Sequence, residues 1–599
     1  MIHPWIKKIV YILLLAWISL PATNLKIFGS DVDGETAGFA RIIPEEALAF
    51  FEWEGFQKDW DLIRQYPFWK KLIAAPDIEH DQAGDIWLLR YLRAHSGLNR
   101  KEFFNFTGRH FGVAFFSGDR PAGISVLFLA KVRDRELAEN TMHDLFSDSP
   151  PAAVDHLFAG DRELPVYCKS NAHGETIFHF ILFKNILIAE KGPSYARLRH
   201  CIHLIGEHGA GALEKNPSYM AIQKVLPEGG SNRGYISLEN AKSTIRASLS
   251  GCSLRIIDCF RDRILENLSG WHAVGFRRQF EPETIITDAV GTYEQADMKE
   301  SLRHLTSVPP SGDHLFTLIP ASALVAESYR TDPAALYQWI VENLGPLCES
   351  MQEQFPILGI PSVPKVSDAM ISSIRRSIGN TMGFALLPPG GVEMIRDIPG
   401  IPLLILTSKN REGAEDILNT GCSLFPSTGR KEREKHNYPV LHSVYQGVEI
   451  KKARCSSLLP LTIYFAFLQN NLILSPVAEC IEEVIDTCLD RARSMNEQAF
   501  FYKWMPSCPE QTHELFIFQG KTVRDGLWFV SLFLDPARCS RREGKNRLTG
   551  SHLTELWRIP VQAAATIETI RGWTVLEEKT WQCNIILSFS ELQDNHGFK

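Results

Sequence analysis

The sequence predicts an α+β fold: two tandem copies of one module, each a mainly antiparallel sheet covered by helices. Two apolar stretches, FHFILFKNILIA at 178–189 and IYFAFLQNNLIL at 463–474, align without a gap. The order of apolar and polar segments around them also repeats. Short strands that follow one another through hairpins and short helices are typical of antiparallel sheets.

Each of the two stretches is predicted to be a β-hairpin. Two short apolar runs flank a polar dipeptide, Lys184-Asn185 in the first and Gln469-Asn470 in the second. A two-residue hairpin turn needs a left-handed backbone conformation, which Asn tolerates. We therefore expect Asn185 and Asn470 to take that conformation. His179 becomes Tyr464 and Lys184 becomes Gln469, so the repetition preserves the apolar pattern.

The first copy follows a linker rich in Gly, Asp and Thr at 29–38. Apolar alternation and helical spacing of apolar residues distinguish its elements. The predicted strands are 41–53, 110–116, 124–130, 164–167, 233–238, 270–276 and 284–292. The predicted helices lie within 60–73, 86–98, 134–146, 194–205, 220–225 and 241–268.

The second copy restarts near Asp313, where Pro320 takes the place of Pro44. Asp332-Pro333 suits a helix start, because proline is tolerated in the first helical turn. The predicted strands are 314–320, 382–387, 401–407, 514–519, 561–568 and 580–589, and 438–440 is matched to 164–166. The predicted helices are 331–344, 411–424 and 477–489. The predicted modules are 38–303 and 304–599.

Residues 1–29 are predicted to be a signal peptide or an N-terminal anchor. His3, Lys7 and Lys8 precede a twelve-residue apolar run at 9–20, and Pro21-Ala22 follows it. This is the layout of an export signal. The run is shorter than the roughly 20 residues of a membrane span. We favour cleavage after Ala22 or Gly29, with an uncleaved anchor as the alternative, and a periplasmic location or attachment to the outer face of the inner membrane.

The composition excludes some classes of protein. The net charge is −7, so the chain as a whole has no basic field for nucleic acid. None of the twelve cysteines forms a C-x-x-C pair. Disulfides between Cys252 and Cys259 and between Cys480 and Cys488 are conceivable, but we favour free thiols because cysteine is often a small core residue.

Candidate sites for chemistry are few. His200, Cys201 and His203, followed by Glu207-His208, have the residue types of a zinc site. The second copy has no histidine there, so we favour an exposed helix end whose histidines suit the helix dipole. The glycines of 206–211 follow a helix, whereas a dinucleotide site follows a strand. The sequence contains no G-x-S-x-G, Walker A, H-E-x-x-H or EF-hand pattern. We therefore assign no catalytic, cofactor-binding or metal residues and no cofactor.

Two basic clusters, at 429–435 and 538–547, suit contact with an anionic surface. The alternative is that they are solvated loops between strands. Glutamates interspersed in the first cluster favour this second interpretation.

The element order resembles that of bacterial exported proteins of the domain-of-unknown-function type, which are built from tandem α+β modules. The resemblance depends on the apolar segments that are predicted as strands in both copies. The residues are Pro44, 112–115, 165–167 and 180–189, then Pro320, 383–386, 439–440 and 465–474. It implies a cell-envelope protein and carries over no catalytic residues.

From these observations we expect a non-enzymatic, exported protein that works by binding or scaffolding. Its expected partner is an envelope protein or another envelope component. Nucleic acid is not expected to bind, and a membrane only through an uncleaved anchor. The alternatives are an extracytoplasmic hydrolase with an unrecognised site and a carrier of lipids or other hydrophobic ligands.

Overall fold

The computed structural model describes fifteen stretches of the chain. They are 38–73, 110–118, 124–132, 135–136, 153–159, 161–170, 176–191, 194–206, 211–249, 255–354, 367–389, 400–423, 440–454, 462–520 and 566–589. The predicted signal or anchor, the helix at 86–98 and both basic clusters lie outside them.

The described strands belong to one large antiparallel sheet of 20 strands. The predicted fold class, two tandem modules that each have their own helix-covered sheet, is therefore wrong. The physical reason is that apolar alternation marks a strand but does not mark where a sheet ends. An edge strand and an inner strand can carry the same pattern.

By their contacts the residues group into two compact units. Unit 1 contains 1–250 and 271–294, and unit 2 contains 251–270 and 295–599. The helical segment 251–270 thus precedes the last strands of unit 1 in the sequence but groups with unit 2. The predicted module boundary at 303/304 concerns the repeated element order and stays a prediction.

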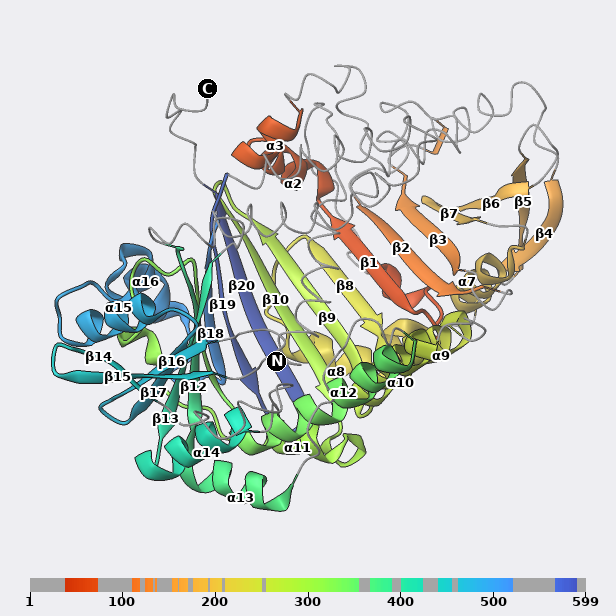
Figure 1. Ribbon diagram of the computed structural model, residues 1–599. Helices are drawn as coiled ribbons and strands as arrows, with labels where there is room; N and C mark the ends of the chain where they lie inside the picture. Colours follow the sequence, from red (N-terminus) through yellow and green to blue (C-terminus); the bar gives the residue numbers. More distant parts are fainter. Residues whose placement is uncertain are drawn as a thin grey trace, which may run out of the picture. The chain divides into compact units, whose positions relative to one another are not determined.

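Ten strands form the sheet of unit 1, and β1, β2 and β3 run side by side in orange in Figure 1. The order across the sheet is β4-β5-β6-β7-β3-β2-β1-β8-β9-β10, with every neighbour antiparallel. The strands are β1 (Ala49–Glu54), β2 (His110–Ser117), β3 (Ile124–Lys131), β4 (Ala153–Ala159), β5 (Arg162–Ser170), β6 (Thr176–Phe183), β7 (Ile186–Lys191), β8 (Asn232–Ser237), β9 (Trp271–Phe280) and β10 (Thr284–Tyr293). The helices are η1 (Phe39–Arg41), α2 (Phe56–Ile63), α3 (Pro67–Ile73), α7 (Ala196–Gly206), η2 (Leu213–Lys215), α8 (Pro217–Val225) and α9 (Leu238–Leu249).

Unit 2 repeats this order strand for strand, as β14-β15-β16-β17-β13-β12-β11-β18-β19-β20. Its strands are β11 (Val325–Arg330), β12 (Ile378–Leu387), β13 (Ile401–Ser408), β14 (Val440–Tyr445), β15 (Val448–Arg454), β16 (Thr462–Leu468), β17 (Asn471–Ser475), β18 (Glu514–Gln519), β19 (Ile567–Leu576) and β20 (Thr580–Phe589). Its helices are α10 (Arg255–Asn267), η3 (Gln295–Asp297), α11 (Glu300–Thr306), η4 (Leu315–Thr317), α12 (Pro333–Gln354), α13 (Asp368–Ser377), α14 (Arg411–Ser423), α15 (Ala478–Cys488), η7 (Met495–Glu497), α16 (Ala499–Trp504) and η8 (Met505–Ser507).

Helices bury one face of the unit 1 sheet. On α7 the apolar residues Leu198, Cys201, Ile202 and Ile205 recur at helical spacing and pack against the strands. Tyr219 and other residues of α8 complete this core. In unit 2, α15 and α16 occupy the corresponding core, and α13 and α14 pack in a separate cluster with β16 and β17.

Both predicted hairpins are confirmed. Phe183 pairs with Ile186 and Leu468 pairs with Asn471, which leaves a two-residue turn in each. The residue expected to be left-handed was wrong. Positive φ angles of 51° and 54° belong to Lys184 and Gln469, the residues before each Asn.

One correspondence between the copies was also wrong. Val440 begins β14, whose place in the strand order matches β4, whereas Pro165 lies in β5. The β14–β15 hairpin was missed, although Gly447 marks its turn. Gln446 and Gly447 have φ angles of 48° and 80°, as a type I′ turn requires.

Candidate functional site

A pocket of about 650 Å³ opens in unit 1 beside the β6–β7 turn, and we call it the hairpin pocket. Its volume lies in the range of roughly 300–1,000 Å³ that is usual for small-molecule sites. Its apolar lining is Ile42, Val132, Phe183, Ile186, Leu204, Ile205 and Ala212. Its polar lining is Arg41, Lys131, Lys184, Asn185, Glu214 and Lys215.

Backbone hydrogen bonds hold the frame of the pocket. The Val132 N–H donates to the Asn185 carbonyl at 2.7 Å and so ties the end of β3 to the turn. The Leu213 N–H donates to the Ile43 carbonyl at 2.7 Å and joins η2 to the segment after η1. These bonds join backbone atoms only. The side chains that line the pocket can therefore differ in charge and polarity without breaking them.

Four cations and one carboxylate lie around the pocket. Three of the cations are the last residues of their elements: Arg41 of η1, Lys131 of β3 and Lys215 of η2. The fourth, Lys184, is the first residue of the β6–β7 turn. Within the described part of the chain, the side chains of Arg41 and Lys215 make no ion pair or hydrogen bond. The Lys184 ammonium lies 5.6 Å from the ring centroid of Phe183.

Unit 2 repeats the frame without these charges. The Ser408 N–H donates to the Asn470 carbonyl at 2.7 Å, and the Met495 N–H donates to the Ile319 carbonyl at 2.8 Å. At the positions equivalent to the four cations, in chain order, unit 2 has Thr317, Thr407, Gln469 and Glu497. The fold therefore does not need positive charge at these positions.

A buried ion pair occupies a second polar place in unit 1. The Glu52 carboxylate accepts the Phe39 N–H at 2.6 Å and His110 Nε2 at 2.8 Å. Both side chains are about 95% buried, and the Phe39 ring lies 4.3 Å from the His110 ring. Burial alone raises the pKa of Glu52. The hydrogen bond and charge of His110, followed by the Phe39 N–H, outweigh burial and lower this pKa.

Charged residues continue from Glu52 across neighbouring strands. Glu52 stands opposite Arg233, Arg233 opposite Arg277, and Arg277 opposite Asp288. Burial, then the nearby Arg233, lowers the pKa of Arg277. The row has an acid at each end and two arginines between them, and Arg233 also pairs with Glu54 at 3.6 Å. The row thus crosses four neighbouring strands, with the covered Glu52–His110 pair at one end.

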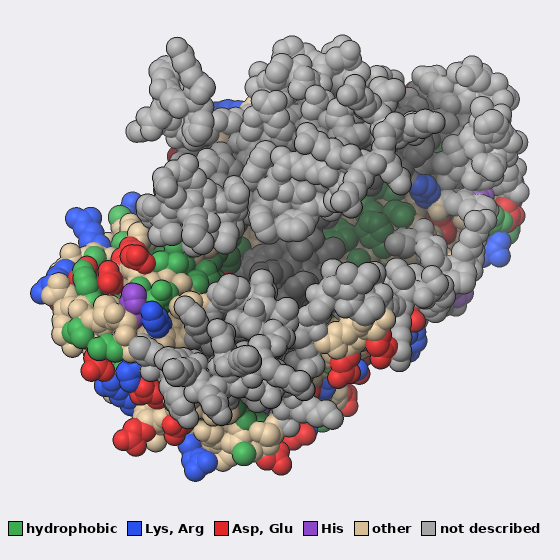
Figure 2. All heavy atoms as spheres, viewed as in Figure 1, with side chains coloured by type: hydrophobic (Ala, Val, Ile, Leu, Met, Phe, Trp, Pro, Cys, Tyr) green, Lys and Arg blue, Asp and Glu red, His purple; other side chains and the backbone are tan. Residues whose placement is uncertain are grey.

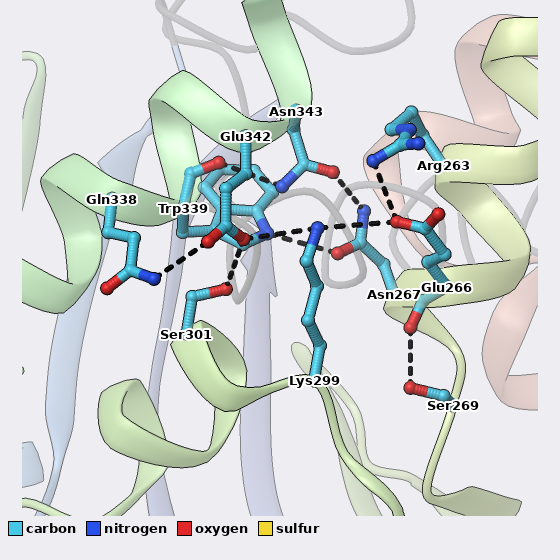
Figure 3. Close-up of polar contacts among 10 residues, drawn as sticks. All are labelled: Arg263, Glu266, Asn267, Ser269, Lys299, Ser301, Gln338, Trp339, Glu342 and Asn343. Carbon is cyan, nitrogen blue, oxygen red and sulfur yellow. Dashed lines mark hydrogen bonds and ion pairs between the residues drawn. The ribbon is translucent and has the colours of Figure 1, made fainter. Parts of the chain in front are cut away.

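A polar network in unit 2 joins α10, α11 and α12 (Figure 3). Lys299 Nζ lies 3.3 Å from Glu266 and 3.1 Å from Glu342. Ser301 Oγ donates to Glu342 at 2.8 Å. Lys299 thus bridges the two carboxylates, and Ser301 is fully buried. The network therefore holds the three helices together.

The network has an amide section that fixes α10 to α12. Trp339 Nε1 donates to Asn267 Oδ1 at 3.0 Å, and Asn267 Nδ2 donates to Asn343 Oδ1 at 2.7 Å. Asn343 Nδ2 in turn donates to the Trp339 carbonyl at 2.8 Å. Each amide thus both donates and accepts, which is how buried polar groups are stabilised.

The candidate zinc ligands point in different directions. Cys201 is fully buried in the core, and burial raises the pKa of its thiol well above 9.0. His200 Nδ1 lies 3.2 Å from Glu46 Oε1. Glu207-His208 and most of the glycine loop lie outside the described residues. Among the described residues, no three His, Cys, Asp or Glu side chains form a group that could hold a metal ion.

The described cysteines of the proposed pairs are free thiols: Cys259, Cys480 and Cys488. Cys252 lies outside the described residues. Burial raises the pKa of the Cys480 thiol to about 11, so this thiol is protonated at neutral pH.

The described surface has no large field of one charge on the face drawn in Figure 2. Lysine and arginine side chains are interspersed with aspartate and glutamate there. No helix in the described part of the chain has the length and apolar character needed to cross a membrane.

The hairpin pocket was missed in the sequence because its residues form no motif. They come from four separate regions, near 41, 131, 184 and 212. One signal was available: the difference between Lys184 and Gln469 at equivalent turn positions. Extending that comparison to every pair of equivalent positions would have marked Arg41 and Lys215 as well.

No protein-family model matches the chain, and no curated protein matches it. Solved structures with some similarity include two crystal forms of TP0453. Crystal form I is 10% identical over 45% of this chain and 83% of that chain, with a TM-score of 0.22. Crystal form IV is 11% identical over 42% of this chain and 79% of that chain, with a TM-score of 0.21.

Proposed function

We propose that this chain is a non-enzymatic binding protein and that the hairpin pocket is its ligand site. The observation that carries the proposal is the pocket itself. It combines a small-molecule volume with an apolar wall and a few polar groups at its rim, which is the usual composition of a ligand site.

The chemistry of the lining favours binding over catalysis. The described lining contains no His, Cys, Ser, Thr, Asp or Tyr side chain. Glu214 is the single acid in this lining, so no acid/base pair faces the pocket. The hydrolase alternative therefore has no support at this site, whereas the hydrophobic-ligand alternative is a special case of the proposal.

We also propose that the protein arose by internal duplication and acts in the cell envelope. The identical strand order of the two units supports the duplication. The basic and apolar pattern of residues 1–29 supports export. Fractionation of native cells tests the location: mature protein in the periplasmic or membrane fraction is expected. Mature protein in the cytosolic fraction would contradict it.

Filling the pocket tests the site. Ile186→Trp places an indole at the apolar wall, and we expect it to abolish binding of 1-anilinonaphthalene-8-sulfonate, measured as saturable fluorescence enhancement. The control is Leu441→Trp on β14, where the native side chain is 53% exposed. It adds the same group at the surface of unit 2 and should leave binding unchanged.

Circular dichroism shows whether Ile186→Trp keeps its fold. Saturable binding by the wild type that a folded Ile186→Trp variant retains would place the ligand elsewhere. Absence of saturable binding by the wild type would count against the proposed function itself.

A further inference from the structure

We infer that the hairpin pocket takes an amphiphile with one anionic head group, a carboxylate or a phosphate monoester, and a hydrocarbon tail. This inference rests on the proposed function and specifies its ligand. It follows from two halves of the pocket that favour different chemistry.

The wall favours a hydrocarbon tail. Leu204 and Ala212 are about 99% buried in the protein, and Phe183 is 91% buried, so the wall is continuous with the core of unit 1. Each methylene group that leaves water for such a wall strengthens binding. A sugar, nucleotide or metal ion would leave this wall unused and lose the hydration of its polar groups.

The rim favours an anionic head group. Four cations and one carboxylate line the pocket, and this excess of positive charge attracts an anion. Arg41 and Lys215 have no acidic partner among the described residues that would neutralise them. A carboxylate or phosphate at the rim converts these charges into charge-assisted hydrogen bonds, the stronger class.

The comparison with unit 2 shows that the charges are not a requirement of the frame. The same two backbone hydrogen bonds form there around Thr317, Gln469 and Glu497. Because the frame is the same and the charge differs, the basic rim is a property of unit 1 alone. An anion-binding role explains why one copy has it and the other does not.

The alternatives differ in charge or size. A cationic amphiphile would face like charges, and a neutral alcohol would gain from the wall alone. A folded protein does not fit a pocket of about 650 Å³. The inference therefore predicts an order of affinity: anionic above neutral, and neutral above cationic, at equal tail length.

The experiment measures displacement of 11-(dansylamino)undecanoate from the full chain. The competitors are hexadecanoate, monohexadecyl phosphate, 1-hexadecanol and hexadecyltrimethylammonium, the ionic ones below their micelle concentrations and the alcohol below its solubility limit. The two anions distinguish a carboxylate from a phosphate source. We expect at least one of them to bind about tenfold or more tightly than the alcohol, and this advantage should shrink with added salt.

The test variant is Arg41→Thr/Lys184→Gln/Lys215→Gln, which removes three positive charges from the rim. We expect it to weaken binding of the preferred anion about tenfold or more and to leave binding of 1-hexadecanol unchanged. The control is Lys58→Gln/Arg162→Thr/Lys224→Gln, three exposed cations of unit 1 that do not line the pocket. It removes the same charge and should bind like the wild type.

Two results would overturn the inference and leave the proposed function standing: equal affinity for anion and alcohol, or equal losses in both triple variants. No displacement of the probe by any competitor, together with unsaturable binding of the probe, would instead contradict the proposed function.

Discussion

Glu52→Ala is expected to lower the free energy of unfolding of unit 1 by about 3–5 kcal/mol, because it leaves His110 buried without its partner. The carboxylate also holds the Phe39 N–H, and alanine cannot replace that bond. Urea unfolding followed by hydrogen exchange of β1 and β2 measures the loss in this unit. A chain with two compact units need not unfold in a single two-state step, so a global signal alone is insufficient.

Unit 2 provides the matched control. At the equivalent position Ser328 Oγ, a neutral hydroxyl, accepts the Leu315 N–H at 3.1 Å. Ser328→Ala should cost about 0.5–1.5 kcal/mol, the usual net value of one hydrogen bond. Glu52→Ser/His110→Thr, which copies unit 2, should recover much of the loss. Equal losses for Glu52→Ala and Ser328→Ala would contradict the role assigned to the ion pair.

The same pair gives unit 1 a characteristic dependence on acid. The pKa of Glu52 in the folded protein lies below the ordinary 4.5. Its contribution to stability is therefore complete above the unfolded pKa and is lost as the pH falls through the folded pKa. The difference in unfolding free energy between the wild type and Glu52→Gln should accordingly shrink below about pH 4.5. A difference that does not change with pH would contradict this assignment.

Trp339→Ala is expected to release α10 from α12 and to lower the stability of unit 2 by about 3–5 kcal/mol. The indole is 9% exposed, and its Nε1 donates to Asn267, so the change removes both a buried aromatic side chain and the bond that fixes the end of α10. Losses of this size are usual for aromatic residues truncated in cores. Hydrogen exchange of the α10 amides reports the release directly.

Gln338→Ala on the same helix is the control. It removes one partly exposed hydrogen bond, 2.8 Å to Glu342, and should cost about 1 kcal/mol or less. Protection in α10 should survive this change. If Trp339→Ala left the α10 amides protected, this helix would not depend on α12.

The sequence predicted local elements well where a strong physical signal exists. Hydrophobic period or turn chemistry marks the turns at Lys184 and Gln469, the stripe of apolar residues on α7, the last two strands of unit 1 and β20. The strand predicted at 561–568 was misplaced, because β19 runs from Ile567 to Leu576. β4 was missed: it reads AVDHLFA, and Asp155 and His156 interrupt its apolar pattern. The turn error has a similar origin, since Asn185 is the better left-handed residue by preference but Lys184 occupies that place.

Long-range arrangement was less predictable. Nothing local in 255–267 indicates that this helix packs on α12, because its amphipathic pattern would suit any apolar surface. The extent of the sheet was equally unpredictable, because the pattern of one strand does not show which strands lie beside it. The hairpin pocket depends on the convergence of four element ends, which only the folded chain brings together.

The grouping of α10 with unit 2 has a consequence for synthesis on the ribosome. Its partner α12 begins at Pro333, well after α10 ends at Asn267. At roughly 5–20 residues per second, the partner emerges several seconds later. During that interval the apolar side of α10 has no native surface to cover it, while β9 and β10 are already available to complete unit 1. Nascent chains stalled between these points are therefore the form of this protein most in need of a chaperone.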